Sequence, residues 1–169
     1  KNNLKTLLVD EKNELGGATI YQNREFNKID NQSSSDWIKK EIQELRNIKN
    51  LEIKTRTSVA AYHGYNYLLA RENLTDHLEK KDKQGKVRQR LLKIRAKKVI
   101  LATGALERPL IFNNNDRPGI MLSSAVKKYA DFYGVVSGKK NIFFTNNDSA
   151  YESALCLHNK GIKVEAVID

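Results

Sequence analysis

The stretch KKVILATGALERPLIF, residues 97–112, decides the fold class. Apolar residues at 99–102 run directly into Thr103 and Gly104, so a strand that should be buried ends in very small side chains. At the carboxyl end of a parallel strand, larger side chains would fill the crevice in which a dinucleotide lies. The stretch therefore predicts a parallel strand at 97–104 and favours a nucleotide-binding α/β fold.

The residues before this stretch predict the rest of such a sheet. An apolar run at 5–11 ends in acids and is typical of a buried parallel strand. Apolar residues at helical spacing over 36–50, with Asp36 or Ser35 as the cap, predict an amphipathic helix. Strands at 51–64 and 65–74 follow, and they start a β-meander.

A strongly basic segment at 79–98 accounts for most of the net charge of +10, because it holds ten Lys or Arg residues against two acids. Basic and apolar residues alternate there around a turn at Gln84 and Gly85, which predicts a hairpin with one solvated face. It contains no aromatic residues that would stack on bases, so a solvated face or a patch for an acidic partner is favoured over nucleic acid.

The last part of the chain predicts a second nucleotide-binding unit. Residues 121–134 form a helical pattern that ends at a glycine, and 139–169 read as strand, tight turn, helix and strand, a complete βαβ unit. Against the glycine fingerprint of such units, Thr145 and Asn147 replace the first two glycines and Ala150 the third. The side chain of Asn147 would block close approach of a ligand, so this turn is interpreted as a scaffold without ordinary dinucleotide binding.

Two acids of this second unit have alternative roles. Asp148, together with Ser149, is expected to cap the helix. Asp169 stands at the position of a ribose-binding acid, and it is otherwise an ordinary residue at a strand end.

The predicted fold class is α/β, an FAD/NAD(P)-binding Rossmann-like parallel sheet with a β-meander, followed by the first βαβ unit of a second Rossmann-like domain. Residues 1–134 are expected to form a partial first domain that lacks its N-terminal strand and Gly-rich turn. Residues 135–140 are the expected boundary, and 141–169 start the second domain. We expect the chain to be part of a longer protein, since it begins at Lys1 and stops after an apolar run.

Several side chains could carry chemistry. Asp10 or Glu11 can accept hydrogen bonds from ribose hydroxyls, while Gly16 and Gly17 let the backbone approach a pyrophosphate. Each also has an ordinary structural explanation, because an acid after a strand is often a turn cap and paired glycines often form a turn. Their order along the chain is what favours the nucleotide site.

Other candidates are weaker. The histidines, His63, His77 and His158, lie far apart in the sequence without ligand spacing, so no metal is expected. Cys156 is expected to be a buried, inert thiol. As the single cysteine, it excludes an internal disulfide and favours a cytoplasmic location. No apolar run is long enough for a membrane helix, so no membrane association is expected.

Two arginines flank the loop after the opening stretch. Arg108 and Arg117 could reach an anionic cofactor, or they could form structural ion pairs with Glu107 or Asp116.

The segments LLVDEKNELGG, VILATGALERPLIFNNNDRPGIMLSSAVKKYADFYGV and FFTNNDSAYESAL together resemble the α subunits of heterotetrameric sarcosine oxidase, within the two-dinucleotide-binding-domain flavoprotein superfamily. The resemblance implies an oxidoreductase acting on the CH–NH bond of sarcosine. It would give glycine and hydrogen peroxide from oxygen, with tetrahydrofolate taking the one-carbon unit, as a subunit acting with β, γ and δ subunits in one-carbon metabolism.

The resemblance also implies where cofactors bind. FAD would bind in the β subunit, FMN between α and β, and NAD in the α segment described by this sequence, which then holds no catalytic residue. The residues matched to the cofactor site are Asp10, Glu11, Lys12, Gly17, Ala18, Val59, Ala102, Thr103 and Gly104. Ala18 departs from the family, which commonly has a hydroxyl residue there.

Two alternatives stay open. The chain could come from the α subunit of a related FAD-dependent amine, proline or opine dehydrogenase, with FAD in the same pocket. It could also be a non-catalytic interaction module that docks a partner through the basic segment at 79–98.

Overall fold

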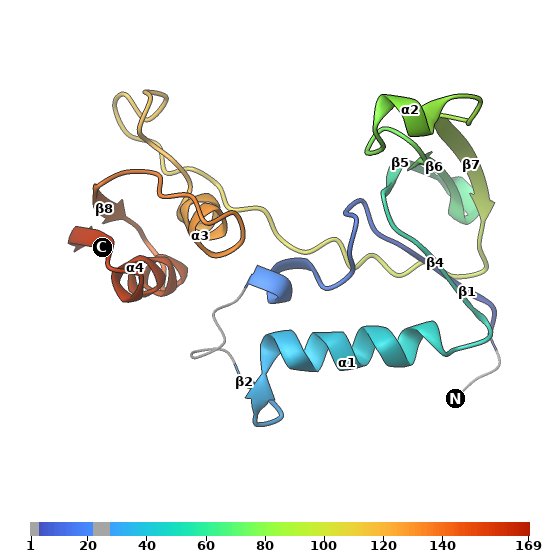
Figure 1. Ribbon diagram of the computed structural model, residues 1–169, viewed down its shortest axis with the longest axis horizontal. Coiled ribbons are helices and arrows are strands. Elements are labelled where there is room, and N and C mark those ends of the chain that lie inside the picture. Colours follow the sequence, from blue (N-terminus) through green and yellow to red (C-terminus); the bar gives the residue numbers. More distant parts are fainter. Residues whose placement is uncertain (1–3, 22–27) are drawn as a thin grey trace. The chain divides into compact units, whose positions relative to one another are not determined.

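The computed structural model describes residues 4–21 and 28–169 (Figure 1). The chain divides into two compact units. One comprises Lys1–Gly17 and Asp36–Thr103, and the other comprises Ala18–Ser35 and Gly104–Asp169. The boundary predicted at 135–140 lies within the range of the second unit and remains a prediction.

The first unit contains a two-stranded parallel sheet. β1 (Thr6–Val9) pairs with β4 (Leu51–Lys54), and Thr6 lies opposite Leu51. A parallel strand within the predicted range 5–11 is therefore confirmed, but none of its residues is fully buried as expected. The predicted helix is α1 (Ser34–Arg46), but it begins two residues earlier than expected. Neither proposed cap is correct, because Ser35 and Asp36 lie inside the first turn of the helix. There the negative carboxylate of Asp36 stabilises the helix by its interaction with the positive end of the helix dipole.

A three-stranded antiparallel meander follows in the order β5-β6-β7. Its strands are β5 (Thr57–His63), β6 (Tyr67–Asn73) and β7 (Gln89–Arg95). The central strand carries the buried Leu68 and Ala70. The meander is confirmed, but the single strand predicted at 51–64 is in fact two strands, β4 and β5, and only β5 belongs to the meander. Short elements complete the chain: η1 (Gly17–Tyr21), β2 (Lys28–Ile29), β3 (Gln32–Ser33), η2 (Gly64–Asn66) and α2 (Lys80–Lys83).

The hairpin predicted at 79–98 is wrong. Its first arm forms α2, and its second arm, β7, pairs with β6 instead of folding back on 79–83. The first arm is almost entirely charged and has no β-branched residue, so it favours a helical turn over a strand. The second arm pairs with the central strand, where Leu92 and Ile94 of β7 lie opposite the buried Ala70 and Leu68 of β6.

The strand predicted at 97–104 is also not observed. These residues run without regular structure, and Ile100 and Leu101 are 90% and 66% exposed. A strand of a parallel sheet is stabilised by ladders to its neighbours. None of the strands within residues 4–21 and 28–169 pairs with this segment, so its apolar character alone does not make it a strand.

The second unit contains the predicted βαβ unit. β8 (Lys140–Phe144) and β9 (Lys163–Ile168) are parallel neighbours joined by α4 (Ser149–Asn159), and α3 (Ser123–Asp131) precedes them. One hydrophobic core lies between these helices and strands. Its buried residues are Val126, Ala130, Phe143, Ala150, Ala154 and Leu157. The predicted second βαβ unit is confirmed.

The start of α3 is capped by a residue far away in the sequence. Residue Leu122 precedes the helix and cannot cap it with its side chain. Instead, Glu107 accepts hydrogen bonds from the backbone N–H groups of Ser123 (3.1 Å) and Ser124 (2.8 Å). Partial burial works against the charged form, but these bonds outweigh it and lower the pKa of Glu107 below its ordinary value of 4.5.

We expect Glu107→Gln to lower the free energy of unfolding by about 1 kcal/mol at neutral pH, as for the loss of other charged caps. Because the folded pKa is lowered, this contribution is present above pH 4.5 and is lost as the pH falls through the folded pKa. Urea unfolding at several pH values measures it. Arg108→Gln, next to it and exposed, is the matched control; an equal loss there would contradict the capping role.

Candidate functional site

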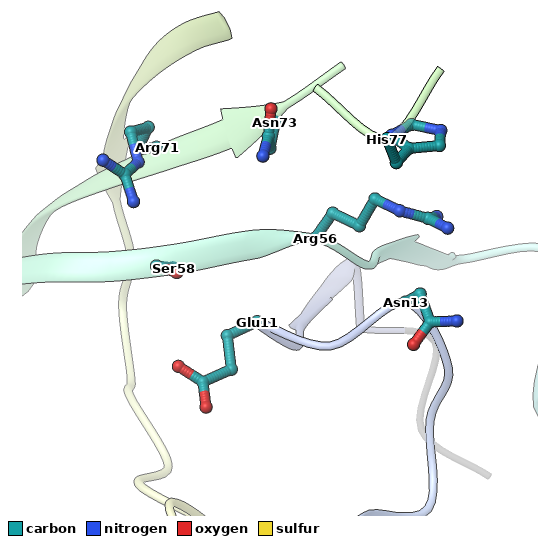
Figure 2. A pocket seen from close by; sticks show the side chains of 7 residues that line it. All are labelled: Glu11, Asn13, Arg56, Ser58, Arg71, Asn73 and His77. Carbon is teal, nitrogen blue, oxygen red and sulfur yellow. The ribbon is translucent and has the colours of Figure 1, made fainter. Parts of the chain in front are cut away.

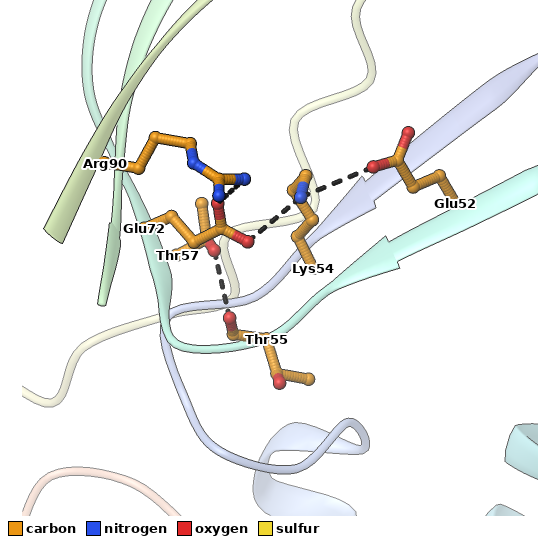
Figure 3. A network of polar contacts seen from close by, with 6 residues as sticks. All are labelled: Glu52, Lys54, Thr55, Thr57, Glu72 and Arg90. Carbon is orange, nitrogen blue, oxygen red and sulfur yellow. Dashed lines mark hydrogen bonds and ion pairs between the residues drawn. The ribbon is translucent and has the colours of Figure 1, made fainter. Parts of the chain in front are cut away.

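A network of charged and polar groups fixes the turn between β4 and β5 (Figure 3). The ammonium group of Lys54 lies 2.9 Å from Glu72 and 3.4 Å from Glu52. Glu72 also lies 3.4 Å from Arg90 on β7. The hydrogen bond to Glu72 and the charges of both glutamates raise the pKa of Lys54 despite partial burial. The turn is thereby fixed to the meander through the ion pair between Lys54 and Glu72.

The loop after β1 lies against this turn. The backbone N–H of Asp10 donates to the carbonyl of Lys54, and its carbonyl accepts from Thr57, both at 2.9 Å. The N–H of Arg56 donates to the carbonyl of Lys12 at 2.7 Å. The predicted cofactor residues Asp10, Glu11 and Lys12 are therefore held beside the start of β5.

The two acids of the loop differ. A carboxylate oxygen of Asp10 accepts the N–H of Lys12 at 2.9 Å, which closes a local turn of the kind that aspartate often forms. Glu11 is exposed, and within residues 4–21 and 28–169 its carboxylate makes no such bond. Of the two, Glu11 has the carboxylate that is available to a ligand.

Glu11 lines a polar pocket of about 330 Å³ (Figure 2). β5 and β6 form one wall, because Ser58 lies opposite Arg71 in the antiparallel register and the N–H of Asn73 donates to the carbonyl of Arg56. The residues that line this polar pocket are Glu11, Asn13, Arg56, Ser58, Arg71, Asn73 and His77. Six of them were not predicted as site residues. Side chains two apart on a strand point to the same face. The polar residues at 56 and 58, and those at 71 and 73, are therefore the sequence signal that could have predicted this pocket.

Val59 lies next to this pocket on β5. It is 46% exposed and pairs with Ala70, and a bulge follows it before Ala61. β5 is an edge strand of the meander, so alternate backbone groups along it face away from the sheet. This geometry fits the predicted contact between the backbone at Val59 and an adenine ring, which remains a prediction.

The remaining predicted site residues are small. Gly17 and Gly104 both have a left-handed backbone, with φ of +56° and +72°, which other residues adopt at a cost. Gly17, Ala102 and Thr103 belong to the first unit, whereas Ala18 and Gly104 belong to the second. All except Gly17 are exposed. Their contact with a cofactor remains a prediction.

In the second unit, the turn after β8 is filled by its own side chains. The amide oxygen of Asn147 accepts the N–H of Ser149 at 3.0 Å and caps α4, while Asp148 makes no side-chain cap bond. The cap expected from Asp148 and Ser149 is therefore wrong. Asp169 accepts the Tyr151 hydroxyl at 3.2 Å. These contacts agree with the interpretation of this turn as a scaffold.

The other candidates have structural surroundings. Glu107 caps α3, and Arg117 donates to the side-chain oxygen of Asn114 at 3.1 Å. Within the described residues, neither Arg108 nor Arg117 forms the ion pair considered for it. Over the same residues no three potential metal ligands among His, Cys, Asp and Glu gather. None of the helices found there is long and apolar enough to cross a membrane.

The sequence of this chain was compared with those of known proteins. No family model matches the chain. Sarcosine oxidase subunits alpha from Corynebacterium sp. strains P-1 and U-96 are each 40% identical over 169 residues, which is all of this chain and 17% of each relative. The subunit from Rhizobium meliloti (strain 1021) is 35% identical over 165 residues, 98% of the chain and 16% of the relative.

The fold also matches a solved structure. The crystal structure of L-proline dehydrogenase from P. horikoshii covers 96% of the chain, with a TM-score of 0.72 and 24% identity, and the chain spans 30% of it. With the parallel strand pairs, this likeness confirms the Rossmann-like α/β class. The resemblance noted in the sequence is confirmed as well, and over its full length the chain is homologous to one segment of the sarcosine oxidase α subunits.

Proposed function

We propose that this chain is the dinucleotide-holding segment of an α subunit in an amine-oxidising flavoprotein complex, and that NAD is the dinucleotide it holds. The similarity to sarcosine oxidase α subunits over all 169 residues carries this proposal. The whole protein would oxidise sarcosine to glycine with tetrahydrofolate and oxygen, and give hydrogen peroxide. It would act in the cytoplasm with β, γ and δ subunits, with FAD and FMN elsewhere in the heterotetramer.

The residues beside β5 fit one end of such a cofactor. The exposed carboxylate of Glu11 would accept hydrogen bonds from the adenosine ribose, and the edge of β5 at Val59 offers backbone groups to adenine. Gly17, Ala102 and Thr103, all in the first unit, would allow close approach of the pyrophosphate and the ring. When bound, NAD supplies a nicotinamide ring that accepts a hydride. The role of this chain is to bind and orient it.

FAD is the second candidate for this pocket. The chain shares its fold with an L-proline dehydrogenase over 96% of its length, and this keeps the related dehydrogenases as the alternative. The surrounding protein would then be an amine, proline or opine dehydrogenase. The loop at Asp10–Lys12 would hold either cofactor through its adenosine half.

Identifying the bound cofactors tests the proposal. The full-length protein is purified natively with its neighbouring subunits, the cofactors are released with acid, and their masses are measured. NAD together with FAD and FMN is the expected result. FAD alone, one for each α chain, would assign the pocket to FAD, and no nucleotide would overturn the proposal.

Replacing Glu11 by glutamine is expected to weaken NAD binding by about 1–2 kcal/mol. This is the low end of the value for hydrogen bonds to charged groups, because Glu11 is exposed. Calorimetric titration of the full-length protein with NAD measures the change. Glu14→Gln removes the same charge from an exposed position in the same loop, and it should leave the affinity unchanged. Equal effects of the two variants would remove Glu11 from the site.

A further inference from the structure

The polar pocket holds more positive than negative charge. Arg56 and Arg71 are two guanidinium groups on its wall, and Glu11 is the single acid among the residues that line it. Within residues 4–21 and 28–169, neither arginine lies in an ion pair. A guanidinium stays charged at all physiological pH values, so this pocket attracts an anion.

Within the described residues, none of the acids on neighbouring elements forms an ion pair with these arginines, and each has another hydrogen-bond or ion-pair partner. Asp10 accepts the N–H of Lys12, and Glu72 pairs with Lys54 at 2.9 Å. Asp76, just after β6, pairs with Arg88 at 2.6 Å and accepts Gln89 at 2.9 Å. The positive charge of the pocket is therefore left for a ligand.

Arg56 is held in an unusual backbone conformation. Its φ is +51°, in the left-handed region where few residues other than glycine and asparagine occur. The N–H bond to Lys12 (2.7 Å) and the bond from Asn73 to its carbonyl (2.9 Å) hold it there. Glycine or asparagine would satisfy the same backbone at lower cost.

Hydrogen-bond donors surround the side chain of Arg56. In Figure 2 it extends from the start of β5 toward His77 on one side and Asn13 on the other. An imidazole and an amide can both donate to an oxygen-rich anion beside a guanidinium. The side-chain amide of Asn73 on β6 also lines this wall.

We propose that the polar pocket binds a phosphate group in its dianionic or monoanionic form, with Arg56 as its principal contact and His77 and Asn13 as supporting ones. A fork of guanidinium donors matches two phosphate oxygens at once. This inference goes beyond the binding of NAD and does not depend on it.

Two sources of the phosphate share this chemistry. It is either free inorganic phosphate or a phosphate ester on the ribose that Glu11 is proposed to hold, as in the 2′-phosphorylated form of NAD. Glu11 repels a phosphate in either case. Glu11→Gln should therefore strengthen phosphate binding while it weakens NAD binding, so the two proposals respond to this variant in opposite directions.

The test is a calorimetric titration of the full-length protein with inorganic phosphate at constant ionic strength. Arg56→Asn suits the left-handed backbone and so preserves the fold, and we expect it to lower phosphate affinity about tenfold or more. Arg71→Gln should lower it less. Lys93→Gln on β7 removes one positive charge outside the pocket and should change nothing. Circular dichroism verifies that each variant is folded.

The outcomes separate the sources. If inorganic phosphate binds, and NAD and its 2′-phosphorylated form bind equally, the occupant is free phosphate. If the phosphorylated form binds more tightly and Arg56→Asn removes the difference, the phosphate belongs to the nucleotide. Equal losses in Arg56→Asn and Lys93→Gln, or no binding of any phosphate, would overturn the inference. Failure of NAD alone to bind would overturn the proposed cofactor and leave the phosphate pocket intact.

Discussion

Replacing Leu157 by alanine is expected to lower the free energy of unfolding by about 2–5 kcal/mol, because the side chain is almost fully buried in the centre of the second unit. Leu157 is 1% exposed on α4 and packs in one core with Phe143 and Ala154. Its removal leaves a cavity that these neighbours fill only in part. Urea unfolding of the protein, followed by fluorescence and circular dichroism, measures the loss.

Leu155 provides the matched control. It lies on the same helix and is 49% exposed, so Leu155→Ala makes the same chemical change without opening a cavity. We expect it to cost well under about 1 kcal/mol, as most surface substitutions do. If the two variants were equally destabilised, α4 would not pack through the face that carries Leu157.

Cys156 is expected to react with iodoacetamide about a hundredfold more slowly in the folded protein than in denaturant at pH 8. The thiol is 1% exposed and lies 3.1 Å from a carboxylate oxygen of Asp131. Burial and this hydrogen bond raise its pKa from 9.0 to about 11. The reactive thiolate is then about a hundredfold scarcer at pH 8, and burial also blocks access.

The pH dependence gives a second measurement of the same property. Below its raised pKa, each unit of pH increases the thiolate fraction about tenfold, so the folded rate should keep rising up to pH 11 or so. The rate in denaturant should level off above the ordinary value near 9.0. Equal rates in the two states would contradict the burial of Cys156. As the only cysteine in the sequence, it leaves no ambiguity about the labelled site.

The parts of the fold that depend on local signals could be predicted. The unit from β8 to β9 needs only an apolar run, a polar turn, a helical period and a glycine at 161, all within 30 residues. The prediction of a strand at 97–104 was wrong. The apolar pattern of this segment shows that it can be buried, but it does not identify a neighbouring strand with which it would pair. The cap of α3 by Glu107 joins positions 16 residues apart, so no local rule could find it.

The candidate site shows the same limit. The acids after β1 could be predicted because they directly follow a strand. Which of them is available could not, because the choice depends on the bond from the N–H of Lys12 to Asp10. Arg56 and Arg71 come from different strands, and they share a pocket only through the register that places Ser58 opposite Arg71. Register between strands depends on tertiary packing, which alternation within one strand does not determine.

The contact between Glu107 and the start of α3 closes residues 108–122 into a surface loop (Figure 1). The conformational entropy of such a closure grows only with the logarithm of loop length, so doubling the loop would cost about 0.6 kcal/mol. Insertions between Glu107 and Ser123 should therefore leave α3 in place as long as both residues are kept. Phe112 packs edge-on against Phe144 of β8, so the part of the loop after Phe112 is where natural variants can differ in length and where a peptide tag can be inserted.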